Sequence, residues 1–271
     1  MSESAEQGLV ELVSHGDVQE IALNNPAVHN AIDPQMYEAL DAAFTTAQAD
    51  PEVNAIVLSG RGKSFCSGFD LKQSSDLAKQ PVFDQYQLLA QQRATLLKVW
   101  DSPKPVVAAV QGHCLGAGFH LMNHVDIVVA SENAKFGEPE ARYSLLPQPF
   151  SVWLVGARKA KELLLLGDTI DAAEAHRIGL VNRVVPEQDL RDTAFAVARR
   201  VALMPPELMG MTKRMVNATL DAQGFRTMHE WAWDQFLITK LMTTELKEKF
   251  LSIGAKDGMR EAYTWMRKRF S

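Results

Sequence analysis

The stretch PVVAAVQGHCLGAGFHLMNHVDIVVAS, residues 105–131, contains the pattern that decides the fold. It begins with a short apolar run, passes through a loop rich in glycine and a short helical segment at about 117–124, and ends in a second apolar run at 125–130. Apolar strands that alternate with helices are typical of a sheet buried on both faces, with right-handed crossovers. The stretch therefore predicts two strands of a buried sheet in an α/β protein.

The same alternation continues toward the N-terminus. An apolar run at 53–58 predicts another strand, and an amphipathic run at about 82–101 predicts a long helix. The runs at 9–14 and 18–23 flank a turn with glycine and predict an antiparallel hairpin, while an Asp-Pro pair predicts a capped helix that begins at Pro34. Together these elements predict a repeated ββα plan.

After about residue 157 the pattern becomes mainly helical. The predicted helices span 159–166, 172–178, 187–204, 206–219 and about 225–269, with one strand at 180–185. We therefore predict a core domain over residues 1–200 and a helical oligomerisation subdomain over residues 201–271. The last helix carries more large apolar side chains than one helical face usually hides, and we expect contacts between subunits to bury them. These side chains are Trp231, Trp233, Phe236, Leu237, Phe250 and Trp265.

Composition narrows the possible partners. The 271 residues carry a net charge of -5, which is not the basic signature of a nucleic-acid-binding or membrane-surface protein. The N-terminus lacks the basic and apolar regions of a signal peptide, and no apolar run reaches the length of a membrane span. Two cysteines are too few for a disulfide framework. We expect a cytoplasmic protein with a small-molecule partner, without nucleic acid or membrane.

Two glycine-bearing loops follow predicted buried strands, where free backbone N–H groups can face a ligand. They are GRGKSFCSGFDLK, residues 60–72, and QGHCLGAGFHLMNHVD, residues 111–126. The first is not a nucleotide-binding P-loop, because Val57 stands where that motif requires glycine. The second is not a dinucleotide fingerprint, because Leu121 occupies the position of its last glycine.

The order and spacing of several segments resemble the crotonase, or enoyl-CoA hydratase/isomerase, superfamily. These segments are the N-x-P...NA pattern of residues 24–31, GKSFCSGFDLK, KPVVAAVQGHCLGAGFHL, FGEPEARYSLLP and EAHRIGLVNRVVP. The resemblance covers roughly residues 8–200, and FLSIGAKDGMREAYTWMRKRF resembles the closing helix of the family more loosely. It implies an α/β fold with a crotonase-like ββα spiral core and a C-terminal helical subdomain. It also implies a homo-oligomer, either a trimer or a dimer of trimers.

The resemblance further implies an acyl-CoA thioester as the substrate, so that CoA belongs to the substrate and no separate cofactor or metal is expected. Reactions beside a thioester pass through an enolate, whose oxygen needs preorganised donors. By the match to the family, the donors are the backbone N–H groups of Phe69 and Ala117. Gly68 and Gly116 stand directly before these donors, where the absence of a Cβ lets the thioester approach the backbone.

The same match supplies the expected contacts with CoA. The loop around Ala27 and Val28 is expected near the adenine, and Lys72 is expected to reach the CoA phosphates. The remaining predicted contacts with the substrate or CoA are Ser67, Gly68, Asp70, Leu71 and Gly116.

The acid/base residues set the reaction. Family hydratases place one glutamate on the helix after the second loop and another in a G-x-P-E segment. Glu140 in FGEPEA matches the second, whereas His120 occupies the position of the first. Histidine titrates near neutral pH and suits general acid/base work. The leading prediction is therefore an enoyl-CoA hydratase-type lyase, with Glu140 and His120 as its catalytic residues.

Other readings remain open from the sequence. A single base, Glu140, is sufficient for an enoyl-CoA isomerase. Hydrolysis of a carbon–carbon bond in a cyclic β-diketone is a rarer family outcome in which histidine participates, and a non-catalytic binding member is a reading from a different class. His120 and His124 are four residues apart, but a third zinc ligand is missing from the pattern. We predict that Cys66 and Cys114 serve packing.

Overall fold

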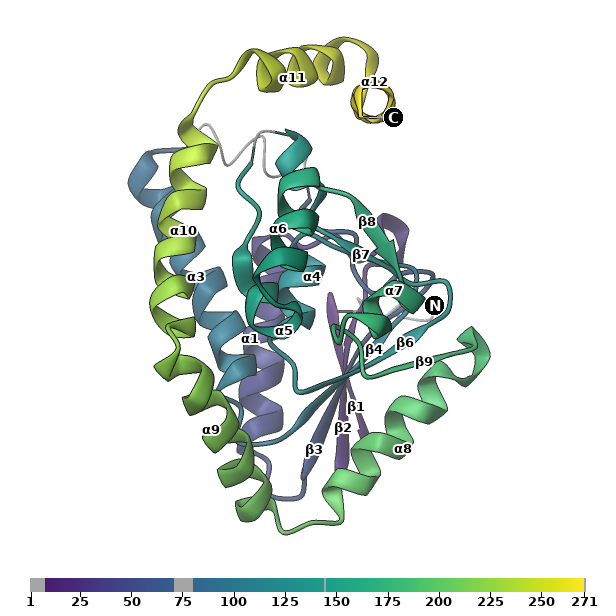
Figure 1. The fold of residues 1–271 in the computed structure, drawn as a ribbon. Coiled ribbons are helices and arrows are strands. Elements are labelled where there is room, and N and C mark those ends of the chain that lie inside the picture. The colour runs from purple at the N-terminus through teal and green to yellow at the C-terminus, as the bar shows by residue number, and fades with distance from the viewer. Residues whose placement is uncertain (1–7, 71–79, 144, 271) are drawn as a thin grey trace, which may run out of the picture.

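The computed structural model describes residues 8–70, 80–143 and 145–270. At its centre lies a six-stranded sheet in the order β1-β2-β3-β4-β6-β9 (Figure 1). The strands are β1 (Val10–His15), β2 (Val18–Leu23), β3 (Ala55–Gly60), β4 (Val106–Val110), β6 (Ile127–Ser131) and β9 (Arg183–Val185). Only the β1–β2 hairpin is antiparallel, and every other neighbouring pair in this sheet is parallel. The predicted hairpin and buried parallel strands are confirmed.

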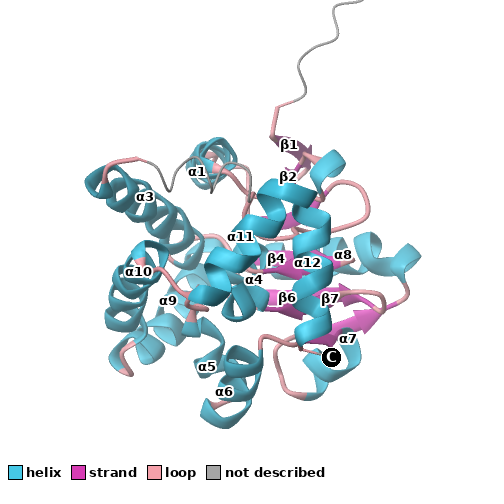
Figure 2. Ribbon diagram, turned by 90° about the horizontal axis from the view of Figure 1, so that it is seen from above, coloured by secondary structure: helices cyan, strands magenta, loops and turns pink. Residues whose placement is uncertain are grey.

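Helices cover both faces of this sheet (Figure 2). The main core lies between the sheet and helices that include α1 (Pro34–Ala49), α3 (Val82–Trp100) and α10 (Phe225–Leu241). The opposite face is covered by α8 (Leu190–Ala202), whose apolar side chains pack on β3, β4 and β6. Asp33 caps α1 by accepting a hydrogen bond from the N–H of Met36 at 2.7 Å, which confirms the predicted start of that helix.

A second, three-stranded sheet was not predicted from the sequence. It consists of β5 (His113–Leu115), β7 (Lys135–Gly137) and β8 (Thr169–Asp171) in the order β5-β7-β8. Three-residue strands are too short to show a periodic pattern. This sheet supplies the second strand of the ββα units, because β4 leads into β5 and β6 leads into β7.

Most of the other helices occupy predicted regions, but α5 was not predicted. They are α4 (Ala117–Met122), α5 (Val152–Val155), α6 (Ala157–Leu166), α7 (Ala172–Arg177) and α9 (Pro206–Ala222), with 3-10 turns at η1 (Pro26–Val28), η2 (Pro139–Tyr143), η3 (Pro149–Ser151) and η4 (Glu187–Asp189). None of the helices in the described ranges is both long and apolar enough to cross a bilayer.

The single long helix predicted at about 225–269 is wrong. It is divided into α10, α11 (Glu245–Asp257) and α12 (Met259–Arg269). The chain is extended at Met242, and Gly258 has a positive φ of 91° that favours glycine. Figure 1 shows α11 and α12 standing apart from the main body beyond the end of α10.

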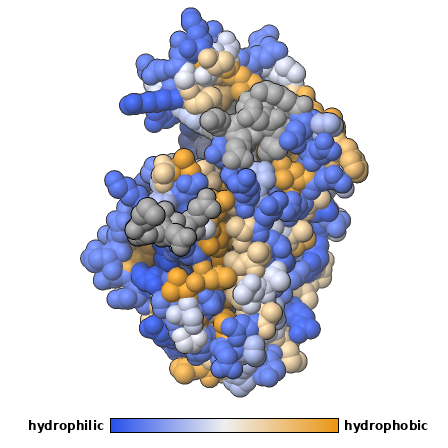
Figure 3. All heavy atoms as spheres, turned by 180° about the vertical axis from the view of Figure 1, so that it is seen from behind, coloured by the Kyte–Doolittle hydropathy of each residue, from blue (hydrophilic) through white to orange (hydrophobic). Residues whose placement is uncertain are grey.

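The expectation that subunit contacts bury the aromatic residues of this region is also partly wrong. Trp233 and Phe236 already lie in the main core of the single chain, and Phe250 packs against α12. Trp231 is 55% exposed. Several apolar patches remain on the face shown in Figure 3. A homo-oligomer remains a prediction.

A buried carboxylate links the sheet to α8. Glu20 on β2 accepts hydrogen bonds from Arg61 at 2.9 Å and Arg191 at 2.6 Å, and from the hydroxyl of Ser59 at 2.8 Å. Burial alone would raise the pKa of Glu20, but these hydrogen bonds lower it to about 2. The folded state therefore binds this proton less readily than the unfolded chain does.

We expect Glu20→Gln to lower the free energy of unfolding at neutral pH by about 2 kcal/mol, since it leaves two arginines without their shared carboxylate and both arginines retain some solvent contact. Because the folded pKa is depressed, the contribution of Glu20 is present above the ordinary carboxyl pKa and disappears as the pH falls toward 2. Urea unfolding across this range measures it. An equal deficit of the variant at neutral and strongly acidic pH would contradict the assignment.

Candidate active site

The two glycine-bearing loops are joined by backbone hydrogen bonds. They run from Phe65 N–H to Gln111 O at 2.7 Å, from Cys66 N–H to His113 O at 2.8 Å and from Leu115 N–H to Cys66 O at 3.0 Å. Both loops leave the same end of neighbouring parallel strands, β3 and β4. The pairing therefore holds the two predicted donor segments side by side.

The predicted donor amides are both available. Ile32 donates to Gly68 O at 2.8 Å and accepts from Asp70 N–H at 2.9 Å, and in such a parallel bridge the N–H of the intervening Phe69 points to the other side. Ala117 is the first residue of α4, so its N–H has no partner within the helix. Neither N–H has a hydrogen-bond partner in the part of the chain that the structure describes.

Glu140 lies against these donor segments. It belongs to η2, and a Cβ built on Gly116 would overlap its Oε1, while a Cβ built on Gly68 would lie 3.7 Å from the same atom. The residue as a whole is partly exposed, but its Oε2 is buried and has no partner within the described ranges. Burial and the nearby Glu138 carboxylate raise the pKa of Glu140 to about 8, although His120 acts in the opposite direction.

His120 projects from α4 into an aromatic surrounding and is 1% exposed. Its ring centroid lies 5.9 Å from that of Phe69, 5.8 Å from that of Phe150 and 6.1 Å from that of Trp233. Burial lowers the pKa of His120 to about 4, even though Glu140 favours its protonation. The imidazole is therefore neutral at physiological pH.

Sequence analysis missed Glu138 as a site residue. Its carboxylate lies 2.9 Å from Nε2 of His120 and accepts a hydrogen bond from Gln148 N–H at 3.2 Å. Burial raises the pKa of Glu138, and the Gln148 hydrogen bond opposes this shift. A signal was present, because Glu138 belongs to the same FGEPEA segment as Glu140 and lies two residues before it.

The surroundings of His124, Cys66 and Cys114 fit a structural role. His124 Nδ1–H donates to His120 O at 2.7 Å, and Nε2 of His124 lies 3.0 Å from Nε2 of His229. Both ring nitrogens of His124 therefore have partners. Burial raises the pKa of the Cys66 thiol to about 12 and that of Cys114 well above its ordinary value. No group of three or more potential metal ligands occurs among the described residues.

The predicted CoA-contacting residues are only partly described. Ala27 and Val28 lie exposed on η1, which is tied to the first loop by a hydrogen bond from Ser67 Oγ to Val28 O at 3.3 Å. Gly68, Asp70 and Gly116 lie at the donor amides, as described above. Leu71 and Lys72 lie outside the described residues.

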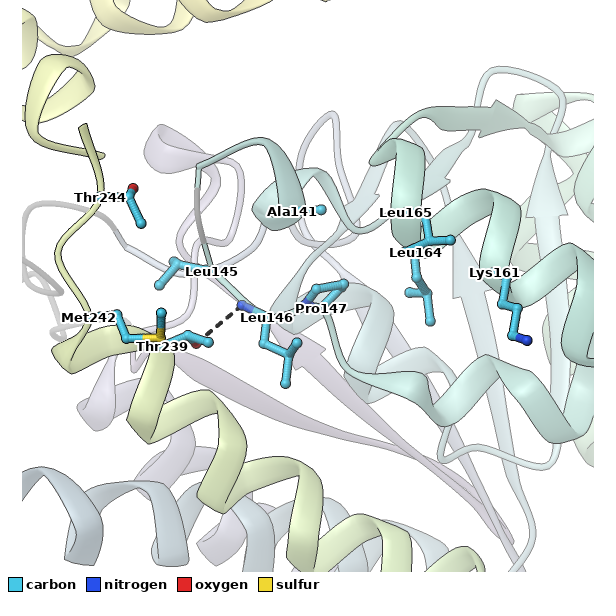
Figure 4. Close-up of a pocket in the computed structure, with 10 residues that line it drawn as sticks. All are labelled: Ala141, Leu145, Leu146, Pro147, Lys161, Leu164, Leu165, Thr239, Met242 and Thr244. Carbon is cyan, nitrogen blue, oxygen red and sulfur yellow. Dashed lines mark hydrogen bonds between the residues drawn. The ribbon is translucent and has the colours of Figure 1, made fainter. Parts of the chain in front are cut away.

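An apolar pocket of about 500 Å³ lies on the segment that follows Glu140 (Figure 4). Its lining comes from η2, the segment at 145–147, α6 and the end of α10. Leu146 N–H donates to Thr239 Oγ1 at 3.2 Å and links that segment to α10. The pocket does not include Glu140, His120 or the donor amides, so it neighbours the acid/base cluster rather than containing it.

Comparisons with known sequences and structures agree with this fold and its paired loops. The enoyl-CoA hydratase/isomerase family model matches residues 14–249. A crystal structure of an enoyl-CoA hydratase/isomerase from Xanthobacter autotrophicus Py2 is 35% identical, covers 97% of this chain and 99% of that chain, and has a TM-score of 0.93. The mitochondrial enoyl-CoA hydratase of Pongo abelii is 33% identical over 209 residues, which are 74% of this chain and 69% of the relative. A mevalonyl-coenzyme A hydratase of Aspergillus fumigatus is 35% identical over 196 residues, 71% of this chain and 72% of the relative.

The fold and the paired loops thus define a crotonase-type protein, as the sequence resemblance implied. The chain belongs to the enoyl-CoA hydratase/isomerase family and is an enzyme of that family. The predicted fold class, a ββα core followed by a helical C-terminal region, is confirmed.

We expect Gly116→Ala to abolish most activity while the chain still folds. Gly116 has a positive φ of 47°, and the added Cβ would displace the carboxyl of Glu140, which is the mobile end of a side chain. Steady-state turnover with an enoyl-CoA and thermal unfolding would be measured together. Full activity of this variant would show that the carboxyl position beside Gly116 is not the working one.

Proposed function

We propose that the protein is an enoyl-CoA hydratase-type lyase, which adds water to a 2-enoyl-CoA thioester or removes it from the product. This proposal rests mainly on the position of the Glu140 carboxyl against Gly68 and Gly116. The N–H groups of the residues that follow these glycines have no hydrogen-bond partner in the described part of the chain. Hydration needs one group that gives a proton to the α carbon and another that takes a proton from water. Glu140 and His120 supply two such groups.

The amides of Phe69 and Ala117 would accept the thioester oxygen between them. Withdrawing electrons toward this oxygen makes the β carbon open to attack by water, and the negative charge that develops on the oxygen is stabilised by both N–H groups. Removing one such donor in an enzyme typically costs about 10²–10³-fold in kcat. The CoA moiety would lie along the predicted contacts Ala27, Val28 and Ser67, and Leu71 and Lys72 stay predicted contacts.

The environments of the two residues favour different roles. A pKa of about 8 keeps the proton on Glu140 at neutral pH, which suits it to protonate the α carbon. His120 is neutral, and its Nδ1 has no hydrogen-bond partner in the described part of the chain. His120 is therefore suited to take the proton from the attacking water. This division favours hydration over isomerisation, which needs only one group.

We expect Glu140→Gln to lower hydration of 2-enoyl-CoA by about 10³-fold, because glutamine keeps the size of the side chain but has no proton to give. The loss of absorbance of the conjugated thioester, with formation of hydroxyacyl-CoA, measures this rate. Glu174→Gln on α7, where the carboxylate pairs with Lys159 and Arg177, is the matched control and should keep wild-type activity. A gain of conjugation from 3-enoyl-CoA substrates would instead establish an isomerase, and silence on every acyl-CoA would favour the diketone hydrolase or non-catalytic reading.

The pH dependence of kcat/KM tests the role of Glu140 separately. As an acid with a raised pKa, Glu140 is active in its protonated form, so hydration should be constant near neutral pH and fall about tenfold per pH unit above about 8. A rate that rises as the pH passes 8 would show that the ionised carboxylate is the active form. That result would assign Glu140 as a base.

A further inference from the structure

Glu138 is a buried carboxylate that the proposed mechanism does not yet use. It is 1% exposed, and both of its oxygens approach Nε2 of His120, Oε1 at 2.9 Å and Oε2 at 3.0 Å. Its other hydrogen bond in the described part of the chain comes from Gln148 N–H. Neither partner is a lysine or arginine, so among the described residues no fixed cation in contact with this carboxylate balances its charge.

This contact decides which nitrogen of His120 is free. With Glu138 ionised, its carboxylate can only accept, so Nε2 carries the proton and donates it to Glu138, which leaves Nδ1 as the basic nitrogen. Nδ1 is buried and has no hydrogen-bond partner among the described residues. A histidine held in this way is ready to take a proton at Nδ1.

The same surroundings make an imidazolium at this position costly. His120 is enclosed by the rings of Phe69, Phe150 and Trp233, and a buried cation requires strong compensation. The other titratable groups that act on this pair in the described part of the chain include Glu140, the next-turn His124, His229 and the Cys114 thiol. Glu138 is the carboxyl in direct contact with Nε2 of His120, so it is placed to receive a proton from that nitrogen.

We infer that Glu138 accepts the Nε2 proton of His120 as Nδ1 takes a proton from the attacking water, so that His120 acts as a base without becoming a cation. This inference rests on the proposed hydratase function. Glu138 is on this view a positioning residue and proton acceptor that acts through His120 rather than on the substrate.

Atoms and charges balance in this step. The water O–H bond breaks and its proton forms the Nδ1–H bond, while the Nε2–H bond breaks and its proton forms the O–H bond of the Glu138 carboxylic acid. The hydroxyl oxygen bonds to the β carbon, and Glu140 then gives its proton to the α carbon of the enolate. The three groups hold one negative charge before and after, which moves from Glu138 to Glu140. The starting state is restored when Nδ1 of His120 gives its proton to the Glu140 carboxylate and the Glu138 carboxyl returns its proton to Nε2.

In this step Glu138 differs from the buried aspartate of a serine protease triad, which stays ionised throughout. Burial raises the pKa of Glu138, and a single backbone N–H besides His120 stabilises its charge. Both features favour uptake of the proton.

The test combines kinetics of Glu138→Gln, His120→Gln and the double variant on a 2-enoyl-CoA. Glutamine can still accept the Nε2–H hydrogen bond but cannot take up the proton. We expect Glu138→Gln to lower kcat by about 10²-fold with KM within about threefold of wild type, because the lost interaction operates in proton transfer. The double variant should be no slower than His120→Gln alone, since Glu138 acts only through His120. Glu174→Gln serves again as the control.

A second measurement does not depend on the variants' stability. The ¹⁵N resonances of histidine-labelled wild-type protein, with His120 assigned by its loss in His120→Gln, should show a neutral ring protonated at Nε2 across neutral pH. An imidazolium signal would overturn the inference, as would full kcat of Glu138→Gln or a double variant whose losses add. A wild-type enzyme that hydrates no acyl-CoA would instead overturn the proposed function on which the inference rests.

Discussion

The hydrogen-bonded pairing of the segment at Phe65 and Cys66 with the segment 111–115 is the constraint on which the site depends. Both segments follow neighbouring parallel strands, so their backbones meet at one edge of the sheet. The pairing uses the amides of these segments and leaves those of Phe69 and Ala117 without partners in the described chain. Since both amides belong to a rigid backbone framework, they are oriented before any substrate binds.

This framework also explains the electrostatics of the site. Two carboxyls and one imidazole are enclosed with aromatic rings, and no lysine or arginine is in contact with them in the described part of the chain. Burial raises the pKa values of Glu138 and Glu140 and lowers that of His120, so an ionised form in this site depends on hydrogen bonds such as the one that Gln148 N–H donates to Glu138. In an enclosed site of this kind, the surroundings alone can make one titratable group an acid and another a base.

Helix α10 joins the C-terminal third of the chain to this site. Trp233 lies beside His120, and Phe236 stacks on Phe69 with their ring centroids 6.0 Å apart. Thr239 on the same helix binds the segment after Glu140. The predicted boundary at residue 200 stays a prediction, but α10 completes both the main core and the wall around the acid/base groups. Helices α11 and α12 form an apolar cluster apart from the main core.

Most of the strand and helix order followed from the sequence alone, because local periodicity reveals it. Motifs with a required spacing predicted the two glycine-bearing loops as donors and Glu140 and His120 as catalytic residues. The sequence did not reveal the short second sheet, the breaks at Met242 and Gly258 or the partnership of His120 with Glu138. Three-residue strands have no readable period, and contacts between distant segments leave no local pattern. Only the tertiary structure decided which charges share a dry environment, since burial and neighbouring groups set protonation there.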